Sequence, residues 1–206
     1  MVGIIGKKIR MTQIFDDAGK VVPVTIIAAG PCMVTQVKTE KTDGYNAVQL
    51  GYQELKEKHT TKPIAGHCKK ANVPPMKYLR EFRSLTAPEA KVGDQLNVEI
   101  FAAGETVQVV AKSKGRGFQG AMRRHGFSGA NKTHGQSDRW RAPGSLGQSS
   151  YPSRVFRGLK MAGKMGNDRI TLSSAKVVKI DAEKNLLFIK GQIPGSTDSL
   201  VQIKKM

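Results

Sequence analysis

The chain has 206 residues and a formal net charge of +18. This length suggests one domain or two, and this charge favours an anionic partner, nucleic acid before a membrane surface. The charge is concentrated in residues 112–169, which hold thirteen Lys or Arg and two acids and so carry +11, whereas the other 148 residues carry +7.

The sequence gives no sign of membrane insertion or export. No stretch approaches the roughly 18 apolar residues of a transmembrane helix, and none reads as a basic amphipathic helix. The N-terminus is a short apolar run followed by charge, the reverse of a signal peptide. Two cysteines, Cys32 and Cys68, are too few for a disulfide framework. A cytoplasmic location is therefore expected.

Short segments rich in β-branched residues, separated by turn signals, occupy both ends of the chain. Residues 1–15 mix apolar clusters with basic residues and predict no clear element. Turns are expected at 16–20 and 42–44, and a short helix near 66–71. Strands are expected at 21–29, 32–39, 45–52, 78–82, 95–101, 105–112, 170–180, 185–190 and 200–203.

This pattern predicts a mainly β fold, a barrel or a sandwich. Residues 1–111 and 170–206 would form one discontinuous domain, with 112–169 as an excursion from it. The excursion holds eleven of the 22 glycines, and its only Val, Ile or Leu residues are Leu146, Val155 and Leu159. It cannot bury enough apolar surface to offset its own ordering entropy, so we expect it to order on an anionic partner.

Gly115–Gly120 fits the G-x-G-x-x-G pattern of dinucleotide-binding loops. The residues that follow lack the apolar helix that a nucleotide-binding βαβ unit requires. The interpretation we favour is a glycine-rich loop whose backbone approaches phosphate closely, with Lys112, Lys114 and Arg116 adding charge.

Two enzymatic alternatives are weaker still. Ser145, His134 and Asp138 could be offered as a hydrolytic triad, but the serine lacks the G-x-S-x-G spacing. His67 and Cys68 are adjacent rather than spaced for a metal, and Cys32 is remote from them. The sequence therefore predicts no catalytic residue, no metal and no cofactor.

Arg139-Trp140-Arg141 contains the only tryptophan of the chain. Trp can stack on a base or sugar, and Arg can pair with phosphate or stack on a base. The alternative is a local Trp–Arg cation–π cluster that stiffens the loop. Residues 142–152 are nearly uncharged, which suits either a tip threaded into a tight space or a simple flexible turn.

With these segments in place, the chain resembles the universal large-subunit ribosomal protein family, L-three, in its bacterial form, along essentially its whole length. The resemblance is carried by the order and spacing of short motifs: Gly3-Ile4-Ile5-Gly6-Lys7-Lys8, Met11-Thr12-Gln13-Ile14-Phe15, Asp43-Gly44-Tyr45, Gly66-His67, Glu81-Phe82-Arg83, Ser113-Lys114-Gly115-Arg116-Gly117-Phe118-Gln119-Gly120, Pro143-Gly144-Ser145-Leu146-Gly147-Gln148 and Lys160-Met161-Ala162-Gly163-Lys164-Met165-Gly166.

The resemblance implies a translation-protein-type β-barrel with a long, mostly irregular basic extension. It implies a structural, non-enzymatic protein that binds large-subunit ribosomal RNA, supports early assembly and extends an arm, residues 112–169, towards the peptidyl transferase centre. The implied partners are that RNA and neighbouring large-subunit proteins, with no membrane and no small-molecule substrate.

The chain departs from the family pattern at three positions. Arg10 stands where the family usually has Gly, and Cys68 where it often has Phe. Ser150 stands where some bacterial members carry a methylated Gln, so that modification is not expected here.

The expected RNA-binding residues combine the basic excursion with the basic N-terminal cluster. They are Lys7, Lys8, Arg10, Lys112, Lys114, Arg116, Arg123, Arg124, Lys132, His134, Arg139, Trp140, Arg141, Arg154, Arg157, Lys160, Lys164 and Arg169. By resemblance, the tip of the arm is formed by Pro143, Gly144, Ser145, Gly147, Gln148, Ser149 and Ser150.

Overall fold

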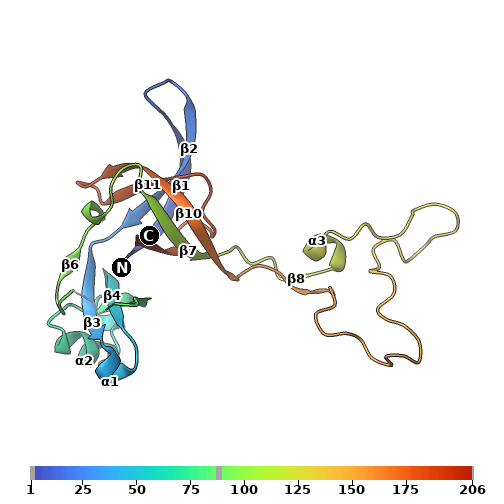
Figure 1. Ribbon diagram of the computed structural model, residues 1–206, viewed down its shortest axis with the longest axis horizontal. Helices are drawn as coiled ribbons and strands as arrows, with labels where there is room; N and C mark the ends of the chain where they lie inside the picture. Colours follow the sequence, from blue (N-terminus) through green and yellow to red (C-terminus); the bar gives the residue numbers. More distant parts are fainter. Residues whose placement is uncertain (1–2, 87–89, 206) are drawn as a thin grey trace. The chain divides into compact units, whose positions relative to one another are not determined.

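Six antiparallel strands close into a barrel in the computed structural model, which describes residues 3–86 and 90–205 (Figure 1). The chain divides into two compact units, Met1–Lys112 with Arg169–Met206, and Ser113–Asp168. The barrel belongs to the first unit and confirms the predicted mainly β fold. Its strands, in spatial order, are β1 (Gly3–Phe15), β12 (Leu200–Lys205), β7 (Thr106–Lys112), β10 (Arg169–Asp181), β11 (Leu186–Lys190) and β2 (Val21–Ala29).

Alternating apolar residues fill the barrel, as period-two patterning requires. On β7, for example, Val107 and Val109 are fully buried, and on β12 so are Val201 and Ile203. The barrel strands β7 and β10 pair up to their ends, with Lys112 opposite Arg169. Residues 113–168 therefore leave the barrel from one strand end and return to its direct neighbour.

A separate four-stranded sheet, which the sequence did not predict, lies in the same unit. Its order is β5 (Met76–Arg83), β4 (Ala47–Glu54), β3 (Cys32–Lys38) and β6 (Gln95–Leu96). Its buried Val34, Leu50 and Phe82 belong to the same apolar cluster as barrel residues such as Ile4 and Ile203. The barrel and this sheet therefore share one core.

Short helices accompany the second sheet. The expected helix near 66–71 is present but starts earlier, as α2 (Lys62–Lys70), because Pro63 suits a first helical turn. The expected turn at 42–44 is the end of a one-turn helix, α1 (Glu40–Asp43), closed by Gly44 at a φ of 78°. A 3-10 turn, η1, covers Glu57–His59. Among the described residues, no helix is long and apolar enough to cross a membrane.

Strand β1 is one of the longest in the chain, but the sequence did not predict it. β1 has 13 residues, yet Gly3 and Gly6 interrupt its apolar pattern. A Cβ at Gly6 would lie 2.7 Å from the carbonyl oxygen of Ala28 and 2.7 Å from Cγ2 of Ile27. This glycine permits close packing of β1 on β2 rather than breaking the strand.

The strand expected at 95–101 was wrong beyond its first two residues. β6 ends at Leu96, and Val98–Ile100 form a 3-10 turn, η2. β6 pairs with β3 through Leu96 opposite Cys32. The next residue would face Pro31, which has no N–H to donate, so the ladder stops there.

Candidate nucleic-acid interface

The second unit, Ser113–Asp168, begins and ends in a paired segment that we call the neck, residues 113–119 with 163–168. The Ser113 N–H donates to the carbonyl of Asp168 at 2.9 Å, and the Arg116 N–H donates to that of Met165 at 2.9 Å. The neck ends in a two-stranded ladder of β8 (Phe118–Gln119) and β9 (Gly163–Lys164). Glycine-rich sequence thus forms regular pairing here, which the sequence did not predict.

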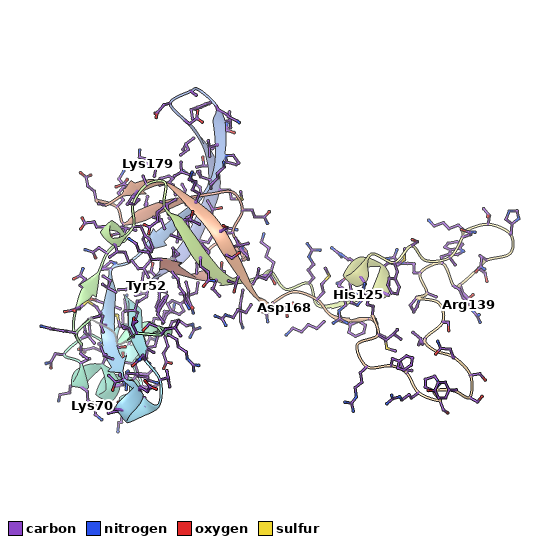
Figure 2. All side chains as sticks on the ribbon, in the orientation of Figure 1. Tyr52, Lys70, His125, Arg139, Asp168 and Lys179 are labelled. Atoms are coloured by element: carbon purple, nitrogen blue, oxygen red, sulfur yellow. The ribbon has the colours of Figure 1, made fainter. Side chains whose placement is uncertain are left out.

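A short helix, α3 (Ala121–His125), follows the neck and contacts the returning chain at Met161. Its Arg124 donates from Nη1 to the carbonyl of Met161 at 2.8 Å, and Nε2 of His125 lies 3.0 Å from the same oxygen. Arg124 is therefore half-buried and partly engaged within the protein. Figure 2 shows His125 on this helix, whereas Arg139 lies on a segment without helix or strand.

Trp140 is held in place but accessible. Its side chain is 41% exposed, and its Nε1 donates to the carbonyl of Gln136 at 3.1 Å. The cation over its ring is Lys132, whose Nζ lies 5.9 Å from the ring centroid. The cation over the ring is therefore a lysine and not one of the two flanking arginines of the expected Trp–Arg cluster. The exposed part of the ring remains available for stacking.

The neutral segment, residues 142–152, is exposed except at half-buried Pro152. All seven residues expected at the tip are exposed: Pro143, Gly144, Ser145, Gly147, Gln148, Ser149 and Ser150. Within it, the Ser145 hydroxyl donates to the carbonyl of Gly147 at 2.8 Å, which closes a small local turn. Pro143 and Gly144 also border a hollow of about 580 Å³ lined by Phe127 and Arg139.

Most of the expected basic contacts are solvent-accessible. Of the residues expected to bind RNA, Lys7 and Arg124 are half-buried. Those that are exposed are Arg10, Lys112, Lys114, Arg116, Arg123, Lys132, His134, Arg139, Trp140, Arg141, Arg154, Arg157, Lys160, Lys164 and Arg169. Because these side chains are already at the surface, they can contact a phosphate without first being uncovered.

Lys8 is the exception and requires a correction. It is only 8% exposed, and its Nζ donates to the carbonyls of Ile193 at 2.7 Å and Gly195 at 3.2 Å. The ammonium thus ties β1 to the segment before β12. Its adjacency to Lys7 made it look like a surface contact, but neighbours on a strand point to opposite faces.

Strand β5 carries a basic surface that the sequence interpretation treated only as a strand. Tyr78 lies between two lysines, with Nζ of Lys7 at 5.7 Å and Nζ of Lys77 at 5.4 Å from its ring centroid. Arg80 follows two positions later and is exposed. The signal for this surface was the presence of Lys77 and Arg80 on either side of Tyr78 in the sequence.

The arrangement does not support the enzymatic alternatives. Residues 115–119 lie in the antiparallel neck, and Gly120 leads directly into a helix of five residues, not into a βαβ unit. The Ser145 hydroxyl is engaged with its own turn. In the part of the chain that the structure describes, no cluster of three or more His, Cys, Asp or Glu could hold a metal.

Comparison with known proteins decides the family. The model of the family described as ribosomal protein L3 matches residues 85–187. Large ribosomal subunit protein uL3 of Herpetosiphon aurantiacus is 51% identical over 203 residues, which cover 98% of this chain and 95% of the relative. The chain belongs to the ribosomal protein L3 family.

Two further relatives agree. The uL3 proteins of a Roseiflexus species and of Corynebacterium jeikeium are 53% and 49% identical, each over 98% of this chain and over 96% and 93% of their own lengths. The family match therefore spans both units, and it confirms the resemblance found in the sequence motifs.

Proposed function

We propose that the chain is a structural protein of the large ribosomal subunit and not an enzyme, acting on the ribosome in the bacterial cytoplasm. The observation that carries this proposal is the near full-length identity to uL3 proteins of three bacteria. The mainly β fold and the accessible basic residues support it.

In this proposal the chain binds large-subunit ribosomal RNA through both units. Residues 112–169 act as the RNA-penetrating arm, with phosphate contacts from their lysines and arginines. Their charge of +11 and the exposure of most of these side chains support this role. The 41% exposure of Trp140 supports a stacking contact of its ring with a base or sugar.

The finer parts of the proposal rest on family resemblance. They are a role in early subunit assembly, contact with neighbouring large-subunit proteins, and approach of the arm tip to the peptidyl transferase centre. The neutral, exposed segment around Gln148 supports the last of these, because small uncharged residues suit a crowded RNA interior.

Binding of the full chain to a transcript of bacterial large-subunit ribosomal RNA tests the RNA-binding proposal. If about eight phosphates are neutralised, log K falls with log salt with a slope of roughly −6 to −7. The ribosomal transcript should also outcompete bulk RNA. Binding that is independent of salt contradicts the proposal, and equal affinity for bulk RNA would favour a general nucleic-acid chaperone acting by charge.

Crosslinking inside assembled large subunits tests the placement of the arm. A photoreactive residue is introduced at one position at a time between Arg139 and Pro152, with a matched probe at Lys184 on the barrel. Crosslinks from 139–152 to the RNA of the peptidyl transferase region are expected. Crosslinks confined to surface RNA would contradict the placement of the tip.

A further inference from the structure

A groove with a basic rim lies on the first unit where edge strand β5 approaches the barrel. It encloses about 300 Å³ and is lined by residues of β5, β7, β10 and β12 and by Ser199, which precedes β12. Its outward-facing apolar residues are Val110, nearly fully buried, and half-buried Leu200, whereas Ala111 points into the barrel core. Its charged residues, among those described, are all cations: Arg80, Lys112 and Arg169.

The three cations come from three strands. Lys112 and Arg169 are directly opposite in the β7–β10 ladder, so their side chains leave the same face of the sheet about 5 Å apart at Cβ. Like charges at such a pair destabilise a sheet. Stability of the barrel therefore does not explain this pair, whereas a bound anion would offset the repulsion.

No carboxylate neutralises these cations within the described part of the chain. The ion pairs there are Lys38 with Glu81 and Lys205 with Glu105. Arg80 uses Nη1 in one hydrogen bond, to the carbonyl of the adjacent Leu79 at 2.9 Å. Its planar guanidinium has five N–H donors in all, a geometry that suits phosphate oxygens.

The positive surface continues beyond the groove. Lys7 is the register partner of Leu200, a groove residue, and its Nζ lies over the ring of Tyr78. Tyr78 and Arg80 are two residues apart on β5 and so lie on the same face of that strand. Cations, an aromatic ring and an apolar floor follow one another here, a combination that suits a sugar–phosphate chain.

We infer that this groove binds the phosphodiester backbone of RNA, with Arg80, Lys112 and Arg169 as the phosphate contacts and Val110 and Leu200 beneath the sugars. The inference rests on the proposed function and assigns an RNA site to the barrel unit, where Arg80 was not among the residues expected to bind. An acidic peptide would also neutralise the three cations, but it has no sugar to pack on the apolar residues of the groove.

The test compares full-length variants for binding to a transcript of bacterial large-subunit ribosomal RNA at several salt concentrations. Arg80→Gln should lower the salt slope by about one and weaken binding roughly fivefold at about 0.1 M salt. Arg80→Lys should keep the slope. Arg80→Gln combined with Lys112→Gln should lower it by about two.

The matched control is Lys184→Gln, an exposed cation of the same unit that does not line the groove. An unchanged slope for Arg80→Gln, or an equal loss for Lys184→Gln, overturns the groove site while leaving the proposed function intact. Polyglutamate that binds the unsubstituted chain but not Arg80→Gln, while the two proteins bind the RNA equally well, would also overturn it, in favour of an acidic peptide. If the unsubstituted chain fails to prefer ribosomal RNA, the proposed function itself fails.

Discussion

At the residue scale, Lys8 is a cation that works inside the protein. Its charge-assisted bonds to the carbonyls of Ile193 and Gly195 hold the segment before β12 against β1. Lys8→Met keeps the length of the side chain but removes both bonds, so we expect a loss of about 2–3 kcal/mol in the free energy of unfolding. Urea unfolding of the full chain measures it.

Lys7→Met is the matched control for this prediction. Lys7 is half-buried and contacts the ring of Tyr78, an interaction worth less than about 1 kcal/mol at an accessible site. A loss for Lys8→Met no larger than that for Lys7→Met would show that the buried bonds contribute little.

Glu81 gives the chain a pH-dependent contact. Its Oε1 lies 2.7 Å from Nζ of Lys38, and the Tyr45 hydroxyl donates to Oε2 at 3.0 Å. The hydrogen bond from Lys38, more than that from Tyr45, holds the pKa of Glu81 below its usual value of 4.5. A lowered folded-state pKa means that this stabilisation is present above about pH 4.5 and is lost as the pH falls through the folded pKa.

Urea midpoints measured from about pH 6 down to pH 3 test this sign. The unsubstituted chain should lose stability more steeply than Glu81→Gln below about pH 4.5, because the amide cannot titrate. Parallel curves for the two proteins would show that the Lys38–Glu81 pair is not coupled to folding.

At the element scale, the sequence predicted what depends on local pattern. β2 was predicted at its observed bounds, β7 to within one residue, and β12 from its first residue. β1 was missed because a glycine that permits close packing looks the same in sequence as one that ends a strand. The second sheet was missed as a separate layer because which strands pair depends on contacts far apart in the chain.

In the second unit, the neck likewise depends on pairing between distant residues, which local sequence pattern did not predict. Low apolar content predicted disorder for the whole of 112–169, but backbone pairing needs no apolar side chain. Gly166 is central to this pairing: it has a φ of 72°, and a Cβ there would collide with the carbonyl oxygen of Lys114. A substitution would therefore combine backbone strain with a clash.

Gly166→Ala should thus open the neck without unfolding the barrel. We expect hydrogen exchange at the Arg116 and Met165 amides to speed up at least about tenfold, which corresponds to the 1–2 kcal/mol cost of the left-handed conformation. Gly158→Ala is the control, because Gly158 has a φ of 83° but open space around it. Unchanged exchange in Gly166→Ala, or equal acceleration in both variants, would contradict this role.

At the scale of the whole molecule, the sequence predicted the kind of partner that the candidate interface binds, but not which residues come together to form it. Charge counting identified the basic segment and an anionic partner. It could not separate Lys8, which is buried, from Lys7, or find that Arg80 joins Lys112 and Arg169 around one groove. Those facts depend on which strands close the barrel, and no single segment of sequence encodes them.

The division into two units leads to a prediction for the whole chain. Lys112 and Arg169 are register partners on neighbouring antiparallel strands, so Asn-Gly in place of residues 113–168 can close β7 and β10 as a two-residue hairpin. The barrel should keep its cooperative unfolding with equal or greater stability, because a shorter loop costs less closure entropy. The replaced segment holds eleven Lys or Arg and two acids, so the variant loses a charge of +9.

Binding of this variant to the ribosomal RNA transcript completes the test. Its salt slope should shrink to the few contacts that the barrel retains, including those of Arg80, Lys112 and Arg169. Each cation contributes about 0.7–0.9 to the slope, so the groove alone accounts for a residual slope of about −2 to −3. A slope as steep as that of the full chain would place the main RNA contacts on the barrel. Loss of cooperative unfolding would instead show that the barrel depends on residues 113–168.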